Sequence, residues 1–251
     1  MPPPPNHPGR RRLGRTVTAA SLLALAGAGA LVHGGIGDLA LPWRLQGAAI
    51  EHAWANVPIA AERHDCSVAL YGDSILYGAH NGMNRLPDPP AALLRELRPM
   101  YRVDDHSFPG DSAHAHVAQF IHTPLTSRIV VLQYGINDAG QGHDYRPALE
   151  TMVAYVRSQG RTPVITGLSR VIEGIPRRDA YDAVAREIAA ASGSAFADWG
   201  AVRFEPRDMA DPVHPGQPYA ERLTRQLMHA IDAVAPECAR LGAPSRVAAR
   251  S

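Results

Sequence analysis

The sequence predicts an α/β fold with a parallel five-stranded sheet, and three observations favour that class. From Cys66 onward, short apolar segments alternate with longer segments in which apolar residues recur at helical spacing. The connections between these segments are short, and glycine or polar residues follow several of the apolar ones. Such alternation is typical of a parallel sheet that carries helices on both faces.

The predicted strands are short segments, most of which are apolar. We expect the five strands at 67–71, 101–104, 128–133, 163–166 and 195–197. The segments between them are rich in Ala, Leu and Arg, which favour helix formation. We expect helices at 90–98, 113–121, 146–159, 180–191 and 218–234. The sequence contains no internal repeat and no second domain boundary in this region.

The composition excludes several classes of protein. The 251 residues are 45% hydrophobic and 20% charged, which indicates a folded core rather than disorder. The formal net charge of +1 does not indicate nucleic-acid binding. All 25 basic residues are arginine, which excludes every mechanism that needs a lysine. Two cysteines cannot form a four-ligand zinc site by themselves.

The first 35 residues have the order of a targeting segment. Arg10, Arg11, Arg12 and Arg15 precede the uncharged apolar run 17–32, which contains small residues at Ala-x-Ala spacing. That order is typical of a secretory signal peptide. The alternative is an uncleaved anchor, in which residues 16–36 tether the chain to a membrane. Either interpretation predicts an exported protein, periplasmic or secreted.

The remaining chain divides into three parts. Residues 36–63 are expected to form a leader or linker, residues 64–235 the α/β domain, and residues 236–251 a polar C-terminal tail.

Ser74 is the first candidate for chemistry. It ends Gly72-Asp73-Ser74, directly after the first predicted strand, where its hydroxyl can face a cleft above the sheet. A serine hydroxyl is a weak nucleophile unless a base lies within hydrogen-bond reach. The tripeptide alone is also typical of a helix N-cap, and it recurs at 110–112. We choose Ser74 as the nucleophile because its strand is the more apolar.

The other candidates follow later strands. Gly110 of the second copy can present its backbone N–H without a side chain in the way. Asn137, after strand 128–133, can donate its amide to an oxyanion, although a turn asparagine is the alternative. Asp211 and His214 precede the last helix, and their spacing lets the carboxylate reach Nδ1 while Nε2 faces the cleft. The alternative for this pair is a surface loop with a capping aspartate.

In this order, these residues resemble the motifs of the GDSL, or SGNH, hydrolase family of esterases and lipases. The resemblance covers about residues 64–235, and Ile75 stands where the family name has Leu. It implies a flavodoxin-like three-layer α/β/α fold and serine ester hydrolysis without a Gly-x-Ser-x-Gly motif, which this chain lacks. The matching blocks are Gly72-Asp73-Ser74-Ile75, the segment 107–112 with Gly110, Gly135-Ile136-Asn137-Asp138 and Asp211-Pro212-Val213-His214.

We therefore predict an acyl-serine mechanism in which Ser74 attacks, His214 carries the proton and Asp211 orients the imidazole. The Ser74 N–H, the Gly110 N–H and the Asn137 amide would form the oxyanion hole. No metal or organic cofactor is expected. Twelve histidines raise the question of a metal site. His114 and His116 are poor joint ligands, however, because they stand two apart in a predicted helix and point to different faces.

The expected partner is a small-molecule, lipid or glycan ester, as for a carbohydrate O-acetyl esterase or a lysophospholipase, and not a nucleic acid. Two alternatives stay open: an acyltransferase that acts on a sugar or other alcohol, and a non-catalytic tethered binding module. By position alone, the residues expected to line the substrate pocket are Tyr77, Asn81, Met83 and Tyr134.

The two cysteines flank the domain. Cys66 precedes the first strand, and Cys238 follows the last helix by a few residues. Helices in such a fold run antiparallel to the strands, so both cysteines are expected at the bottom of the sheet. Export would permit their oxidation, and we predict a Cys66–Cys238 disulfide, the alternative being two unpaired thiols.

Overall fold

A computed structural model describes residues 64–82 and 84–241. The predicted targeting segment, nearly all of the leader, Met83 and the last ten residues of the tail lie outside the described residues. None of the helices within the described part of the chain is long and apolar enough to cross a membrane.

The core of the fold is a five-stranded parallel sheet with the strand order β4-β1-β5-β6-β7. Every residue of β1 and β5 is buried, which explains why both read as continuous apolar runs rather than alternating ones. The predicted fold class is confirmed. The strands are β1 (Ser67–Gly72), β4 (Arg102–Asp105), β5 (Ile129–Gln133), β6 (Thr162–Thr166) and β7 (Ala195–Ala197).

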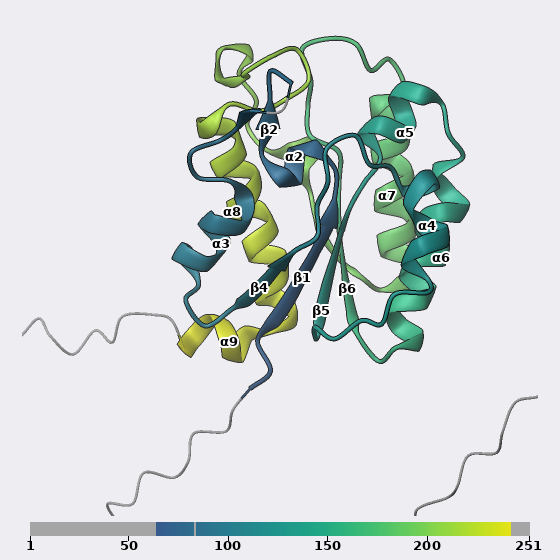
Figure 1. The fold of residues 1–251 in the computed structure, drawn as a ribbon, viewed down its shortest axis with the longest axis vertical. Helices are drawn as coiled ribbons and strands as arrows, with labels where there is room; N and C mark the ends of the chain where they lie inside the picture. The colour runs from purple at the N-terminus through teal and green to yellow at the C-terminus, as the bar shows by residue number, and fades with distance from the viewer. Residues whose placement is uncertain (1–63, 83, 242–251) are drawn as a thin grey trace, which may run out of the picture. The chain divides into compact units, whose positions relative to one another are not determined.

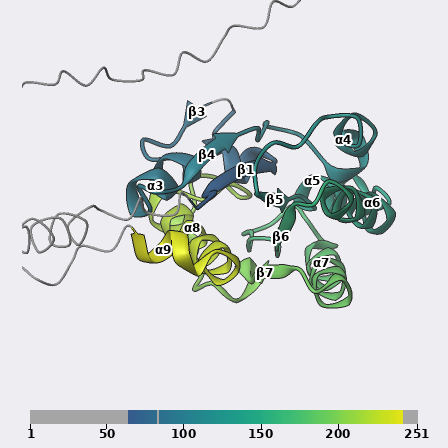
Figure 2. The same ribbon diagram turned by 90° about the horizontal axis from the view of Figure 1, so that it is seen from below.

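Helices cover both faces of the sheet, giving three α/β/α layers (Figures 1 and 2). Helices α3 and α8 lie on one face, and α4, α6 and α7 lie on the other. Each presents an apolar stripe to the sheet; α8, for example, buries Tyr219, Leu223, Leu227 and Ile231 at four-residue spacing. The five are α3 (Pro90–Leu97), α4 (Ala113–Phe120), α6 (Tyr145–Ser158), α7 (Arg178–Ser192) and α8 (Gln217–Val234).

Several short elements near the carboxyl ends of the strands were not predicted. They are α2 (Ser74–Tyr77), the hairpin of β2 (Ala79–His80) and β3 (Asn84–Arg85), α5 (Ile136–Gln141), and the 3₁₀ turns η1 (Trp199–Ala201) and η2 (Pro206–Asp208). Each is only two to six residues long. A segment this short carries too few residues for a periodic pattern.

The start of the expected tail is ordered. Residues Pro236–Leu241 form helix α9, where a polar tail was predicted. Cys238 within it is buried and is disulfide-bonded to Cys66, the pair predicted from the sequence, with a Cα–Cα distance of 5.8 Å. An ion pair between Arg128 and Glu237 adds a second attachment. The bridge spans 172 residues of sequence, and cross-linking so long a loop stabilises a fold by about 5 kcal/mol in the chain-entropy description.

Candidate active site

The strand β1 ends in a close approach that places Ser74. A Cβ on Gly72 would lie 2.6 Å from Oε1 of Gln133 on neighbouring β5, so only glycine fits there. Asp73 follows as the N-cap of α2, and its Oδ1 accepts from the Ile75 N–H at 2.9 Å. Ser74 is therefore the first residue of α2. Helix α2 lies near the carboxyl ends of the central strands (Figure 1).

The loop before α8 folds around its own aspartate. Oδ1 of Asp211 accepts from the backbone N–H groups of Val213 and His214 at 3.0 and 2.8 Å. The same carboxylate lies 2.9 and 3.0 Å from Nδ1 of the His214 ring. On the other side of the ring, Nε2 lies 2.9 Å from the Ser74 Oγ. The three residues singled out from the sequence thus form a continuous hydrogen-bonded relay.

The Asp211 carboxylate has a further donor that the sequence did not predict. The backbone N–H of Asn81, in the β2–β3 hairpin, donates to Oδ2 at 2.9 Å. Burial raises the pKa of Asp211, but the hydrogen bonds from Asn81, His214 and Val213 outweigh it and lower the pKa to about 2. Asn81 was expected to line a pocket. That expectation stays a prediction; the structure shows in addition that the Asn81 backbone holds the carboxylate that orients His214.

The second Gly-Asp-Ser copy has a different role. Ser112 is the N-cap of α4, and its Oγ accepts from the Ala115 N–H at 3.1 Å. Gly110 has φ +84°, a left-handed conformation that favours glycine, although a Cβ there would meet nothing within 4 Å. The structure therefore separates the two copies: Ser74 contacts His214, and Ser112 caps a helix.

Asn137 lies in the first turn of α5, at the end of β5. Its Nδ2 donates one hydrogen to the carbonyl of Asp111 at 2.6 Å. The next residue, Asp138, accepts from the N–H groups of Ala113 and His114 at 3.1 and 3.0 Å. These contacts join the loop after β4 and the start of α4 to the first turn of α5, so that the segments that carry Gly110 and Asn137 are held together.

Two more residues were expected to line a pocket. The Tyr77 ring is partly buried beneath the guanidinium of Arg85, at 4.1 Å from the ring centroid. Tyr134 differs from the expectation: it is only 1% exposed, and its hydroxyl donates to Asp111 Oδ2 at 3.2 Å. Its strand-end position gave no sign of which way the side chain turns.

Comparison with known proteins decides the family. The model of the GDSL-like lipase/acylhydrolase family matches residues 70–222, which is more than half of the chain and includes all the motifs above. The chain belongs to the GDSL-like lipase/acylhydrolase family. The resemblance predicted from the sequence is therefore confirmed, and the protein is a carboxylic ester hydrolase.

Solved structures share the fold of this GDSL-family hydrolase. TesA is 23% identical, with 67% of this chain and 99% of that one covered and a TM-score of 0.55. A catalytic mutant of Axe2, an acetylxylan esterase from Geobacillus stearothermophilus, is 20% identical, with 66% and 93% covered and a TM-score of 0.52. The esterase EstA from Pseudoalteromonas sp. is 12% identical, with 68% and 100% covered and a TM-score of 0.52. A search of curated proteins found no match.

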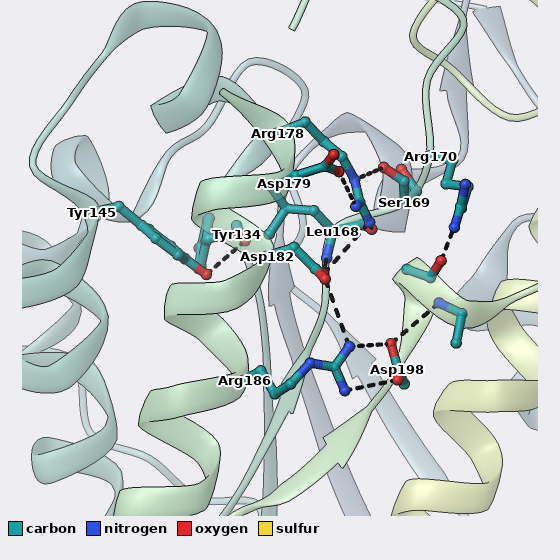
Figure 3. A network of polar contacts seen from close by, with 12 residues as sticks. Tyr134, Tyr145, Leu168, Ser169, Arg170, Arg178, Asp179, Asp182, Arg186 and Asp198 are labelled. Carbon is teal, nitrogen blue, oxygen red and sulfur yellow. Dashed lines mark hydrogen bonds and ion pairs between the residues drawn. The ribbon is translucent and has the colours of Figure 1, made fainter. Parts of the chain in front are cut away.

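A charged network in this GDSL-family chain connects the loop after β6 with helix α7 (Figure 3). Asp182 accepts from the Leu168 N–H at 2.7 Å and pairs with Arg178 at 3.5 Å and Arg186 at 3.6 Å. Arg186 in turn makes two hydrogen bonds to Asp198, at 2.7 and 2.8 Å. The network fixes the loop after β6 to helix α7 and to the end of β7.

The loop after β6 also supports the segment around His214. The N–H of Ile172 donates to the carbonyl of Pro212 at 2.8 Å, and the N–H of Arg170 donates to the Tyr219 hydroxyl at 3.0 Å. The segment that carries His214 is thus held from the β6 side as well as by the β2–β3 hairpin. Within residues 64–82 and 84–241, no three His, Cys, Asp or Glu side chains come together as a metal-binding group.

The burial of Asp73 is expected to make the stability of this chain depend on pH. The residue is fully buried, and its Oδ2 has no hydrogen-bond partner in the described part of the chain. Burial raises the pKa of Asp73 from 3.8 to about 7, against the hydrogen bond from Ile75. The folded chain binds this proton more tightly than the unfolded chain does. Protonation of Asp73 therefore stabilises the folded state at low pH. The effect is lost as the pH rises through about 4 to about 7.

We expect Asp73→Asn to remove this dependence. Between pH 5 and pH 8, the free energy of unfolding of the variant should rise relative to wild type by about 2–3 kcal/mol. Urea unfolding of both proteins at the two pH values measures the difference, with the exposed Asp144 replaced in Asp144→Asn as the matched control. Equal pH profiles for Asp73→Asn and wild type would contradict the buried, protonated carboxyl.

Proposed function

We propose that this hydrolase cleaves carboxylic esters through an acyl-serine intermediate, with Ser74 as the nucleophile. One observation carries the proposal: His214 Nε2 lies 2.9 Å from the Ser74 Oγ while Nδ1 is held by Asp211. A serine becomes an effective nucleophile when a base is placed in this way. The low pKa of Asp211 keeps its carboxylate ionised, so that it can stabilise the imidazolium that forms.

The reaction proceeds in two halves. As the Ser74 Oγ attacks the ester carbonyl carbon, His214 takes its proton, and a tetrahedral oxyanion forms. The intermediate then expels the alcohol, which receives that proton from His214. A water molecule, deprotonated by His214, attacks the acyl-serine and releases the carboxylic acid, and Ser74 regains its proton.

Three donors stabilise the oxyanion in this proposal: the N–H groups of Ser74 and Gly110 and the Asn137 amide. Asn137 suits the role because the Asp111 carbonyl takes one of its two amide hydrogens and leaves the other for the substrate. Each such donor contributes about 3–4 kcal/mol of transition-state stabilisation in hydrolases of this type.

The proposed substrates are esters met outside the cytoplasm: an acylated glycan, a lysophospholipid or another small ester. Two features support export, namely the N-terminal order of basic, apolar and small residues and the disulfide between Cys66 and Cys238. Export is compatible with both alternatives for the N-terminal segment, a cleaved signal peptide and a retained membrane tether. The acetylxylan esterase among the fold neighbours supports including acetylated glycans in the substrates to be tested.

A panel of p-nitrophenyl esters from acetyl to palmitoyl tests this function, with and without an acceptor alcohol. We expect hydrolysis of at least one ester at rates that depend on Ser74, and the preferred acyl length then separates acetyl esters from lipid esters. Formation of a new ester with the acceptor in preference to the free acid would favour the acyltransferase. No turnover above the Ser74→Ala variant with any ester would favour the binding module.

A further inference from the structure

The carbonyl of Asp111 determines how the Asn137 amide can turn. The hydrogen bond from Nδ2 to this carbonyl is short, at 2.6 Å, and it links residues 26 positions apart in the sequence. An asparagine side chain without such a partner rotates among several orientations. The aim of the second amide hydrogen therefore depends on where the Asp111 backbone is held.

Three groups hold the Asp111 side chain in place. Oδ1 accepts from the Ser112 N–H at 2.9 Å, and Oδ2 accepts from the Tyr134 hydroxyl at 3.2 Å. Oδ2 also lies 2.9 Å from Nδ1 of His116, one turn into α4. The side chains of Asp111 and His116 are only 12% and 20% exposed, so these contacts are largely protected from water.

The two side-chain donors connect Asp111 to different elements. Tyr134 follows β5 and precedes the turn that carries Asn137, and its own carbonyl accepts from the Tyr145 hydroxyl at 3.0 Å (Figure 3). The Tyr134 and His116 rings are roughly parallel, with centroids 5.9 Å apart. Burial and the neighbouring Asp111 charge raise the pKa of Tyr134 well above 10, so its hydroxyl keeps the proton that it donates.

From these contacts we infer that Asp111, clamped by Tyr134 and His116, is a positioning residue that aims the Asn137 amide at the oxyanion. The inference rests on the proposed function, because it assigns the clamp a role in the same reaction. Asp111 does not touch the substrate in this scheme. A loosened clamp should lower the stabilisation of the transition state and leave substrate binding unchanged.

Single substitutions separate this role from a structural one. Tyr134→Phe removes only the hydroxyl, and His116→Ala removes the other donor. We expect each to lower kcat by about 5- to 20-fold with KM changed less than about twofold, since removing an oxyanion donor outright costs about 10²- to 10³-fold. His114→Ala, an exposed histidine on the same helix, should leave kcat unchanged. Rates are expressed per active site titrated with a phosphonate, which corrects for misfolded protein.

A double-mutant cycle with Asn137→Ala decides the mechanism. If the clamp acts through the Asn137 amide, Tyr134→Phe should change kcat less than about twofold once that amide is absent. An undiminished effect in the Asn137→Ala background, or an effect on KM alone, would overturn the inference. If Tyr134→Phe fails to fold, the same cycle with His116→Ala gives the answer.

The same data separate this inference from the proposed function. An active Ser74→Ala variant would overturn the function itself. Inactive Ser74→Ala and impaired Asn137→Ala, together with wild-type kcat in both clamp variants, would overturn only the role of Asp111.

Discussion

Ser74→Ala is expected to lower kcat for ester hydrolysis by about 10⁴-fold or more while the fold stays intact. The substitution removes the nucleophilic oxygen that contacts His214, so no acyl-serine can form. The oxyanion donors that remain stabilise only the uncatalysed attack of water. Initial rates on the best p-nitrophenyl ester measure the loss. The urea midpoint should stay close to that of wild type.

Ser112→Ala is the matched control, because Ser112 ends the other Gly-Asp-Ser tripeptide. It removes the N-cap bond to Ala115, so the free energy of unfolding should fall by about 1 kcal/mol while kcat stays within a few-fold of wild type. An inactive Ser112→Ala together with an active Ser74→Ala would reverse the assignment of the two copies.

His214→Ala is expected to have an effect of the same order as Ser74→Ala, because the imidazole carries the proton in every step. Asp211→Ala should retain about 10- to 100-fold more activity, since the carboxylate orients the ring and stabilises its charge without accepting the proton. Single-turnover acylation of His214→Ala and Asp211→Ala on one ester gives the ranking, with Ser74→Ala as the blank that cannot be acylated.

The reverse ranking of His214→Ala and Asp211→Ala would contradict the proposed roles. An Asp211→Ala variant less active than His214→Ala, with both folded by circular dichroism, would contradict the division of roles between them. A residual rate in His214→Ala close to wild type would show that another base serves Ser74.

The sheet was predictable because its central strands are buried on both faces. The run that becomes β5 is apolar at four of its five positions, and Gln133 at its end meets the backbone of Asp73. The spacing of Asp211 and His214 was equally informative. In a tight loop, two residues three positions apart keep their side chains close together. The two Gly-Asp-Ser copies could be ranked only through the strands before them.

The contacts across loops could not be predicted. Asn81 adopts a positive φ of 42°, which a non-glycine residue rarely does, and its N–H reaches a residue 130 positions away. The bond between Asn137 and Asp111 likewise depends on how the first turn of α5 meets the loop after β4. Helix α9 was missed because its few residues look polar, and its order comes from its attachments to Cys66 and Arg128.

Covalent labelling tests the identity of the nucleophile most directly. The protein is treated with a p-nitrophenyl phosphonate, reduced, cleaved after arginine and analysed by mass spectrometry. Ser74 then lies in the peptide 64–85, whereas Ser112 lies in the peptide 103–128. We expect one phosphonate per chain, on Ser74 by fragment ions, and none in Ser74→Ala. A label on Ser112 or another residue, or labelling of Ser74→Ala at the wild-type rate, would contradict Ser74 as the nucleophile.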